Sequence, residues 1–228
     1  MTSQEHLTLT LPTFGVQRNL RDQITQTLRA AVISGELRPG VVYSAPSLAT
    51  QFGVSATPVR EAMLDLVKEG LIDTVRNKGF RVTEPSEKDL DDLSELRALI
   101  EVPTVRRLAE TGVDPAVIAE LRPLATGIEH AAAAHDLIAH VATDMQFHLR
   151  LLEQAGNPHL VETVRSLRSR SRIYGLRGLA DRDELIPSSH EHAELLDLIE
   201  ARDAAGAEAL MTRHIRHVRG IWAEEPRH

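Results

Sequence analysis

Apolar side chains recur at helical spacing in the N-terminal third of the chain, first over residues 18–34 and then twice over residues 48–71. The first stretch places five apolar residues on one side: Leu20, Ile24, Leu28, Val32 and Ile33. The second stretch is interrupted at Gly53, a residue type that adopts the backbone conformation of a tight turn between helices. We expect Ser55 to cap the next helix and Gly70 to end it.

The chain continues with two short patterns typical of strands, over residues 71–75 and 80–83. The sequence Asn77-Lys78-Gly79 between them has the residue types of a hairpin turn, and Arg76 and Arg81 add cations beside Lys78. A pair of helices followed by such a hairpin is typical of a winged helix-turn-helix, whose second helix enters the major groove of DNA with its N-terminus first.

This geometry places Ser55, Thr57 and Arg60 where they would contact phosphates and base edges. Helix pairs joined through a glycine also occur in proteins that do not bind DNA, so a purely structural role is the alternative. We divide this part of the chain into a flexible arm, a winged helix-turn-helix domain and a linker: residues 1–16, 17–83 and 84–87.

Six helical patterns, opened by capping residues or closed by glycine, fill the rest of the chain. They cover residues 86–112, 114–134, 136–155, 157–174, 187–201 and 203–222, the fifth opening at Pro187-Ser188. Aromatic residues make up only 3% of the chain, which favours helices over a β-sandwich or barrel. The sequence therefore predicts a mainly α fold: an N-terminal winged helix-turn-helix domain and a C-terminal all-helical bundle of about six helices over residues 88–222.

The net charge of the whole chain, −7, at first argues against a DNA partner, but the charge is unevenly distributed. Residues 17–83 hold nine lysines and arginines against six acidic residues, a balance of +3, whereas residues 84–228 hold 17 against 26, a balance of −9. Such polarity fits a protein that binds DNA at one end. The chain has no cysteine, no apolar run long enough for a membrane span and no signal-peptide pattern, so we expect a cytoplasmic protein.

Asp144 and His148 lie four residues apart on the third predicted helix of the bundle and therefore project from one face. By itself this spacing is weak evidence for a metal, because an Asp/His pair on a helix usually forms a surface hydrogen bond. His192 and His214, on the fifth and sixth predicted helices, strengthen it, because antiparallel neighbours in a bundle can bring all four side chains inward.

The N-terminal motifs resemble those of the GntR family of bacterial transcription regulators. Residues 20–83 carry that family's pattern: Gly-x-Leu-x-Pro-Gly from Gly35, Leu48-Ala49, Val-Ser-x-x-Pro-Val-Arg-Glu-Ala from Val54, and Glu-Gly-Leu from Glu69. The resemblance implies DNA contacts by six residues: Thr57, Arg60 and Ser55, with Ser44, Ser47 and Lys78 as weaker candidates. The chain departs from the pattern at Ala45-Pro46-Ser47 and at Ala56, where relatives often carry charged residues.

The C-terminal part resembles the all-helical FCD ligand-binding domain of FadR-like GntR regulators, and its six helices resemble those of the VanR-type subgroup. The family's Asp-x3-His, Glu-His and Met-x-x-His motifs match Asp144 and His148, His192 and His214. The resemblance implies a divalent metal ion, zinc most of all, with nickel or manganese as alternatives. It also implies that Arg97 binds a carboxylate effector; the alternative for this residue is an ion pair with Glu101, one helical turn away.

Together these features predict a homodimeric, metabolite-responsive transcription regulator, a repressor by default, that binds operator DNA and a small carboxylic acid and does not bind membranes. One alternative is a regulator that senses the metal itself. A metal-dependent enzyme is a further alternative, which the sequence disfavours because it carries no His-Glu-x-x-His helix, nucleophile motif or glycine-rich phosphate loop.

Overall fold

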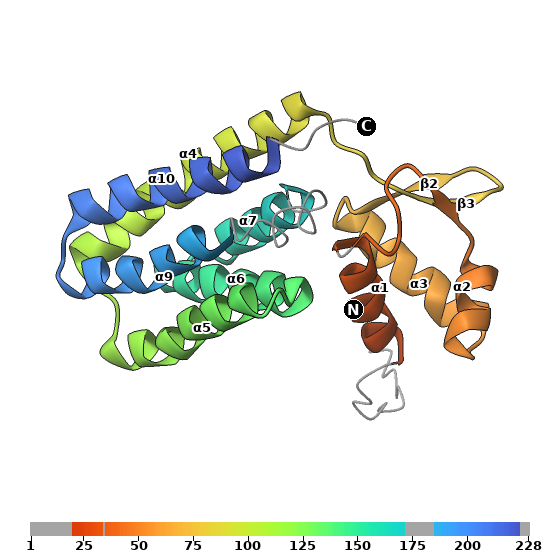
Figure 1. Cartoon of the computed structure of the whole chain (residues 1–228), viewed down its shortest axis with the longest axis horizontal. Helices are drawn as coiled ribbons and strands as arrows, with labels where there is room; N and C mark the ends of the chain where they lie inside the picture. Colours follow the sequence, from red (N-terminus) through yellow and green to blue (C-terminus); the bar gives the residue numbers. More distant parts are fainter. Residues whose placement is uncertain (1–19, 34, 172–184, 224–228) are drawn as a thin grey trace, which may run out of the picture.

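The computed structural model of the chain describes residues 20–33, 35–171 and 185–223, which form a small N-terminal domain and a larger helical one (Figure 1). The predicted flexible arm, residues 1–16, lies outside the described residues. The predicted fold class is confirmed: the N-terminal domain is a winged helix-turn-helix and the C-terminal domain is a bundle of helices. None of the described helices combines the length and apolar character that a membrane span requires.

The winged domain contains, in chain order, α1 (Leu20–Ile33), β1 (Val42–Tyr43), α2 (Ala45–Phe52), α3 (Ala56–Lys68), β2 (Ile72–Val75) and β3 (Gly79–Val82). The strand β3 lies in the middle of an antiparallel sheet, with β1 and β2 on either side. Val42 of β1 is paired with Arg81, and Ile72 of β2 with Val82. The strand β1 was not predicted from the sequence, because two residues are too few to show an alternating pattern.

The helix pair α2–α3 turns at Gly53, which has a φ of 66° and whose N–H caps the carbonyl groups at the end of α2. At two serines the helix caps differ from those expected from the sequence. Ser55 occupies the N-cap position of α3, but its side chain makes no capping hydrogen bond. Ser44 caps α2 instead, because its Oγ accepts a hydrogen bond from the N–H of Ser47 at 3.2 Å.

Two ion pairs hold α1 against α3 and the residue that follows it. Arg21 binds both carboxylate oxygens of Asp65, and Arg29 binds both oxygens of Glu69. Between these helices and the sheet lies an apolar core that includes Leu28, Val59, Leu66, Leu71 and Phe80. The core, to which Val59 belongs, fixes the orientation of α3 and leaves Thr57 and Arg60 on its exposed side.

The described part of the helical domain comprises α4 (Glu87–Thr111), α5 (Pro115–Ala133), α6 (Leu137–Leu152), the 3₁₀ turn η1 (Glu153–Ala155), α7 (Pro158–Ser171), α9 (Leu185–Glu200) and α10 (Ala204–Ala223). Capping explains several starts: Ser86 and Asp89 form a reciprocal capping box before α4, and Asp114 accepts a hydrogen bond from the N–H of Ala116. The helix α9 begins at Leu185, two residues before the predicted start, because proline is tolerated in a first helical turn.

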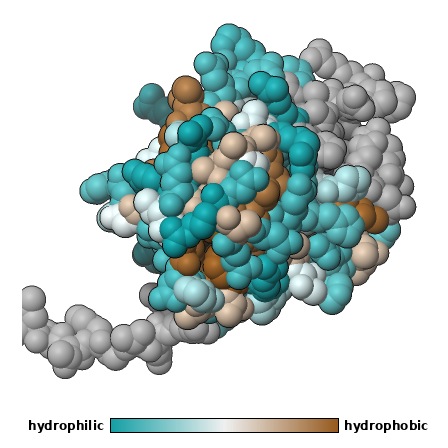
Figure 2. All heavy atoms as spheres, turned by 90° about the vertical axis from the view of Figure 1, so that its left-hand side faces the viewer, coloured by the Kyte–Doolittle hydropathy of each residue, from teal (hydrophilic) through white to brown (hydrophobic). Residues whose placement is uncertain are grey.

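The helices of this domain pack around one apolar core that includes Leu121, Ile128, Phe147 and Leu196. The helix α4 packs against α10 and α7, while α5 packs against α6 and α9. Seen from the end opposite the winged domain, hydrophilic residues cover most of the surface and leave only small apolar areas (Figure 2). The polar side chains described next therefore lie deep between helices.

The helix α1 and the end of α3 lie on the side of the winged domain that faces the bundle (Figure 1). Ile33, at the end of α1, packs against a small cluster of buried residues from the helical domain: Ala132, Val141 and Leu185. Apolar contact between the domains therefore reaches α6, the helix that carries two of the predicted metal ligands.

Candidate functional site

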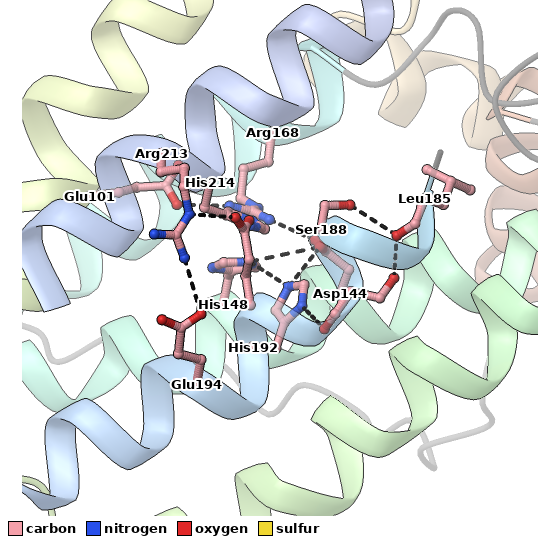
Figure 3. A network of polar contacts seen from close by, with 12 residues as sticks. Glu101, Asp144, His148, Arg168, Leu185, Ser188, His192, Glu194, Arg213 and His214 are labelled. Atoms are coloured by element: carbon pink, nitrogen blue, oxygen red, sulfur yellow. Dashed lines mark hydrogen bonds and ion pairs between the residues drawn. The ribbon is translucent and has the colours of Figure 1, made fainter. Parts of the chain in front are cut away.

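The four predicted metal ligands converge at one point inside the bundle (Figure 3). Asp144 and His148 project from α6, His192 from α9 and His214 from α10. Each offers one ligand atom, and these atoms lie within 4.8 Å of one another. All four side chains are buried, so three segments far apart in sequence form a closed group that could hold a metal ion.

Hydrogen bonds on the outer side of two imidazoles direct their Nε2 atoms toward this point. Nδ1 of His192 lies 2.9 Å from the carbonyl oxygen of Ser189, and Nδ1 of His214 lies 2.8 Å from Oε2 of Glu191. When Nδ1 carries the proton, Nε2 presents a lone pair, which is the usual arrangement of a metal-binding histidine.

The inner nitrogen atoms fit an ion better than they fit one another. Nε2 of His214 is buried without a hydrogen-bond partner. Nε2 of His148 lies 3.1 Å from Nε2 of His192, and those two atoms can share only one proton. A cation between the imidazoles would use all three lone pairs at once, so the residues present suit a metal ion.

Burial also keeps two of the imidazoles, those of His148 and His214, neutral. It lowers the pKa of His148 well below its ordinary value, and the neighbouring charge of Arg168 lowers it further. Burial lowers the pKa of His214 to about 4, against the opposing effect of its hydrogen bond to Glu191. At neutral pH both histidines are therefore uncharged, which is the form that binds a metal.

The carboxylate of Asp144 divides its two oxygens between the cluster and an arginine. Oδ1 lies 3.2 Å from Nε2 of His192 and 3.7 Å from Nε2 of His148. Oδ2 accepts a hydrogen bond from Nη2 of Arg168 at 2.6 Å. One oxygen therefore remains for an ion, while the other is held by a buried guanidinium.

Behind this carboxylate, charged side chains form a chain of buried ion pairs. Nη1 of Arg168 donates to Oε2 of Glu101 at 2.7 Å, and Nε of Arg97 donates to Oε1 of the same carboxylate at 2.7 Å. The ion pair between Arg97 and Glu101, the alternative considered from sequence, is thus present. Nη2 of Arg97 remains buried without a hydrogen-bond partner, which leaves one donor for a further ligand.

Three residues of this site were missed by sequence reasoning as partners of the metal ligands. Glu101 was considered only as a partner of Arg97, and Arg168 was assigned no role. Glu191 stands directly before His192 in the family motif, and that adjacency was the available signal for it. Arg168 and Glu101 carry no comparable signal, because their contacts join separate helices.

The residues predicted to contact DNA lie on the exposed side of the winged domain. Thr57 and Arg60 are exposed on the first two turns of α3, and Ser55 is exposed just before it. Lys78 is exposed in the hairpin between β2 and β3, next to Asn77, whose φ is 59°. Ser47 is exposed on α2, whereas Ser44 is partly buried and caps that helix.

Two family models match the chain. The model described as "Bacterial regulatory proteins, gntR family" matches residues 20–82, and the model described as "FCD domain" matches residues 92–217. The first covers the winged domain, and the second covers most of the helical bundle, including all four residues of the metal-binding group.

Similar proteins carry regulator names and match over most of their length. The Nta operon transcriptional regulator of Aminobacter aminovorans is 32% identical over 186 residues, which cover 81% of this chain and 85% of that protein. The transcriptional repressor GlaR of Escherichia coli is 28% identical over 195 residues, 82% of this chain and 89% of that protein. The solved structure of E. coli McbR/YncC superimposes with a TM-score of 0.73 at 27% identity, covering 87% of this chain and 94% of that one.

Proposed function

Because the chain belongs to the gntR family of bacterial regulatory proteins and carries an FCD domain, we propose that an ion in its helical domain helps a small carboxylic acid to control operator binding. The chain is a DNA-binding transcription regulator. In our proposal residues 17–83 bind DNA, residues 88–222 bind the effector and dimerise, and residues 84–87 link the two. A repressor role is supported by GlaR and RspR, relatives named as repressors. A regulator that acts on bacterial DNA works in the cytoplasm.

The single observation that carries the proposal is the buried group of one carboxylate and three imidazoles within 4.8 Å. One oxygen and three nitrogen ligands suit zinc, and the same set accepts nickel or manganese. When bound, the ion would act as a Lewis acid that attracts an anionic oxygen of the effector. Asp144, His148, His192 and His214 would hold it.

The charge balance around the site supports an anionic effector. Arg97 and Arg168 contribute two buried positive charges, and Glu101 and Asp144 contribute two negative ones. Histidines bind a metal in the neutral form, and the charge of Glu191 is balanced by Arg213. The charges of the four buried side chains cancel, so a divalent ion would add two positive charges that the protein does not compensate. Uncompensated charge is costly in a buried site. A carboxylic acid bound to the ion and to the unpaired Nη2 of Arg97 would reduce that cost.

On the DNA side, we assign base and phosphate contacts to Ser55, Thr57 and Arg60 on α3, with Ser47, Ser44 and Lys78 as supporting contacts. The exposure of Ser55, Thr57 and Arg60 supports this assignment. The surplus of +3 on residues 17–83 is modest, so one copy would bind weakly. Two copies on a two-fold operator would bind more strongly.

A homodimer is further supported by two leucines on α4. Leu96 and Leu99 lie three residues apart, on neighbouring positions of the helix surface, and expose 47% and 66% of their area. Neighbouring exposed apolar side chains form a surface of the kind that partner proteins cover. A second copy of the chain, bound through the same surface, would bury both.

The decisive experiment is a gel shift with DNA upstream of the protein's own gene, with zinc or chelator, and with a panel of organic acids. An acid that releases DNA only when zinc is present supports the proposal. A change in DNA binding that zinc produces in full, with no further effect of any acid, would make the protein a metal sensor instead. Consumption of an acid during the assay would point to a metal-dependent enzyme.

The ion itself is tested by native mass spectrometry of the wild type and of His148→Ala. We expect one zinc ion per chain in the wild type and none in the variant. His190→Ala is a matched control, because this exposed histidine lies on α9 beside His192 and contacts Glu129 instead. Stoichiometric metal in His148→Ala would refute the site.

A further inference from the structure

A cavity of about 410 Å³, partly open to solvent, lies between the winged and helical domains. Arg29 and Ile33 of α1 and Leu71, which follows α3, line it on the winged side. Met145 of α6 and Ser169 of α7 line it on the other side. The cavity indicates that the interface between the domains is loosely packed. The position of the winged domain therefore depends on the positions of α6 and α7.

The metal-binding group lies directly behind this wall. Asp144 directly precedes Met145 on α6, and Arg168 directly precedes Ser169 on α7. On each helix the first residue of the pair faces the site and the second lines the cavity. The hydrogen bond of 2.6 Å between Arg168 and Asp144 joins the two helices at this level. Figure 3 shows Arg168 directed toward Asp144, whose carboxylate also contacts His148 and His192.

Arg170, two residues further along α7, reaches the winged domain itself. It lines a second cavity, of about 380 Å³, together with Lys68 and Gly70 at the end of α3. Gly70 has a φ of 75°, and a Cβ added there would lie 2.8 Å from Cδ of Arg170. The side chain of Arg170 thus packs against the turn that ends the DNA-recognition helix.

We propose that Arg168 is a positioning residue for the ion and that α7 communicates ion binding to the winged domain through Arg170. This inference rests on the proposed function. Arg168 holds one oxygen of Asp144 in place, so the other faces the imidazoles. A divalent ion attracts that carboxylate and repels the guanidinium behind it, which shifts the balance of the contact that joins α6 to α7. The contact between Arg168 and Asp144 therefore has one arrangement with the ion and another without it. Since Arg170 of α7 also packs against Gly70, these two arrangements favour different positions of α3.

The positioning role is tested with cobalt in place of zinc, because Co²⁺ reports its coordination through visible absorption. Arg168→Lys keeps the buried charge but loses the planar fork that binds Asp144 and Glu101 together. We expect cobalt affinity to fall by about 10-fold or more and the absorption bands to change. An unchanged spectrum and affinity in a folded variant would overturn the positioning role.

The coupling is tested with Arg170→Ala, a change at an exposed residue outside the metal-binding group. We measure the binding of a fluorescent duplex from upstream of the gene with and without zinc, and zinc binding by competition with a chromophoric chelator. In the wild type we expect zinc to change DNA affinity by about 5-fold or more. In Arg170→Ala we expect unchanged zinc affinity and less than a twofold effect of zinc on DNA binding.

Arg122→Ala serves as the matched control, because this exposed arginine pairs with Asp197 and Glu200 within the bundle and should leave the coupling intact. Full coupling in Arg170→Ala, or a wild type that binds zinc and DNA without any effect of one on the other, would overturn this inference alone. A wild type that binds no zinc would instead refute the proposed function.

Discussion

Oε2 of Glu191 lies 2.8 Å from Nδ1 of His214, and this hydrogen bond fixes which nitrogen of that imidazole faces the metal-binding group. Glu191 is itself held by Arg213, whose Nε donates to Oε1 at 3.0 Å. The carboxylate therefore lies between a surface arginine and a buried histidine. It supports the ligand without belonging to the four residues that converge.

We predict that Glu191→Gln lowers zinc affinity by about 10-fold to 100-fold, the usual cost of losing a carboxylate behind a metal-binding imidazole. A glutamine keeps the shape of the side chain but removes the negative charge that makes the imidazole a stronger ligand. Competition with a chromophoric chelator measures the affinity. Glu194→Gln is the control, because Glu194 is exposed and contacts Arg213 but not His214. Equal affinities in both variants would show that Glu191 does not act on the ion.

The four predicted metal ligands illustrate what local pattern can predict. Asp144 and His148 were found from helical spacing, because four residues bring side chains onto one face. His192 and His214 were assigned their role through the family motifs, since nothing local fixes how helices 44 or more residues apart meet. The pairs of Arg168 with Asp144 and with Glu101 span 24 and 67 residues, and only the packed bundle determines them.

The secondary structure was likewise predicted where its signals are local in the sequence. Capping residues and glycines marked the starts and ends of most helices, because those signals act on the nearest turn of backbone. The strand β1 was not predicted, because Val42 and Tyr43 form a strand only by pairing with β3. The start of α9 at Leu185 was missed because proline marks a first turn without fixing its first residue.

For DNA recognition, we predict that Arg60→Ala weakens operator binding by about 10-fold to 100-fold, equivalent to about 1–3 kcal/mol. Arg60 is exposed on the second turn of α3, so the variant should fold normally. Lys68→Ala is the control, because Lys68 lies in the last turn of the same helix and pairs with Asp65. Fluorescence anisotropy at fixed salt measures both. Equal losses of DNA affinity in both variants would indicate that the two cations only attract DNA electrostatically. The first turns of α3 would then not recognise the operator.

For assembly, we predict that Leu99→Glu raises the dimer dissociation constant by about 100-fold. A two-fold interface contains the residue twice, and each buried leucine contributes about 1.5–3 kcal/mol. Leu64→Glu is the control, because Leu64 is a similarly exposed leucine of the winged domain. Sedimentation velocity over a range of protein concentrations separates monomer from dimer. An unchanged dimer in Leu99→Glu would place the interface elsewhere.

The wing depends on Gly79, where we predict that Gly79→Ala destabilises the hairpin by about 2 kcal/mol or more. Gly79 has a φ of 131°, a conformation that side chains rarely adopt, and an added Cβ would overlap the carbonyl oxygen of Tyr43 in β1. That neighbour is backbone within the sheet, so it cannot move aside without breaking the pairing of β1 with β3. Hydrogen–deuterium exchange of peptides covering residues 72–82 measures the loss directly.

Gly53→Ala provides the comparison for that experiment. Gly53 also has a positive φ, 66°, but no atom lies within 4 Å of the position that its Cβ would take. The substitution should therefore cost only the backbone strain, about 1 kcal/mol. If the overlap with Tyr43 governs the wing, exchange in residues 72–82 rises much more in Gly79→Ala than in Gly53→Ala, and DNA affinity falls with it because Lys78 loses its position. Similar exchange in the two variants would mean that the close approach of β1 does not hold the wing.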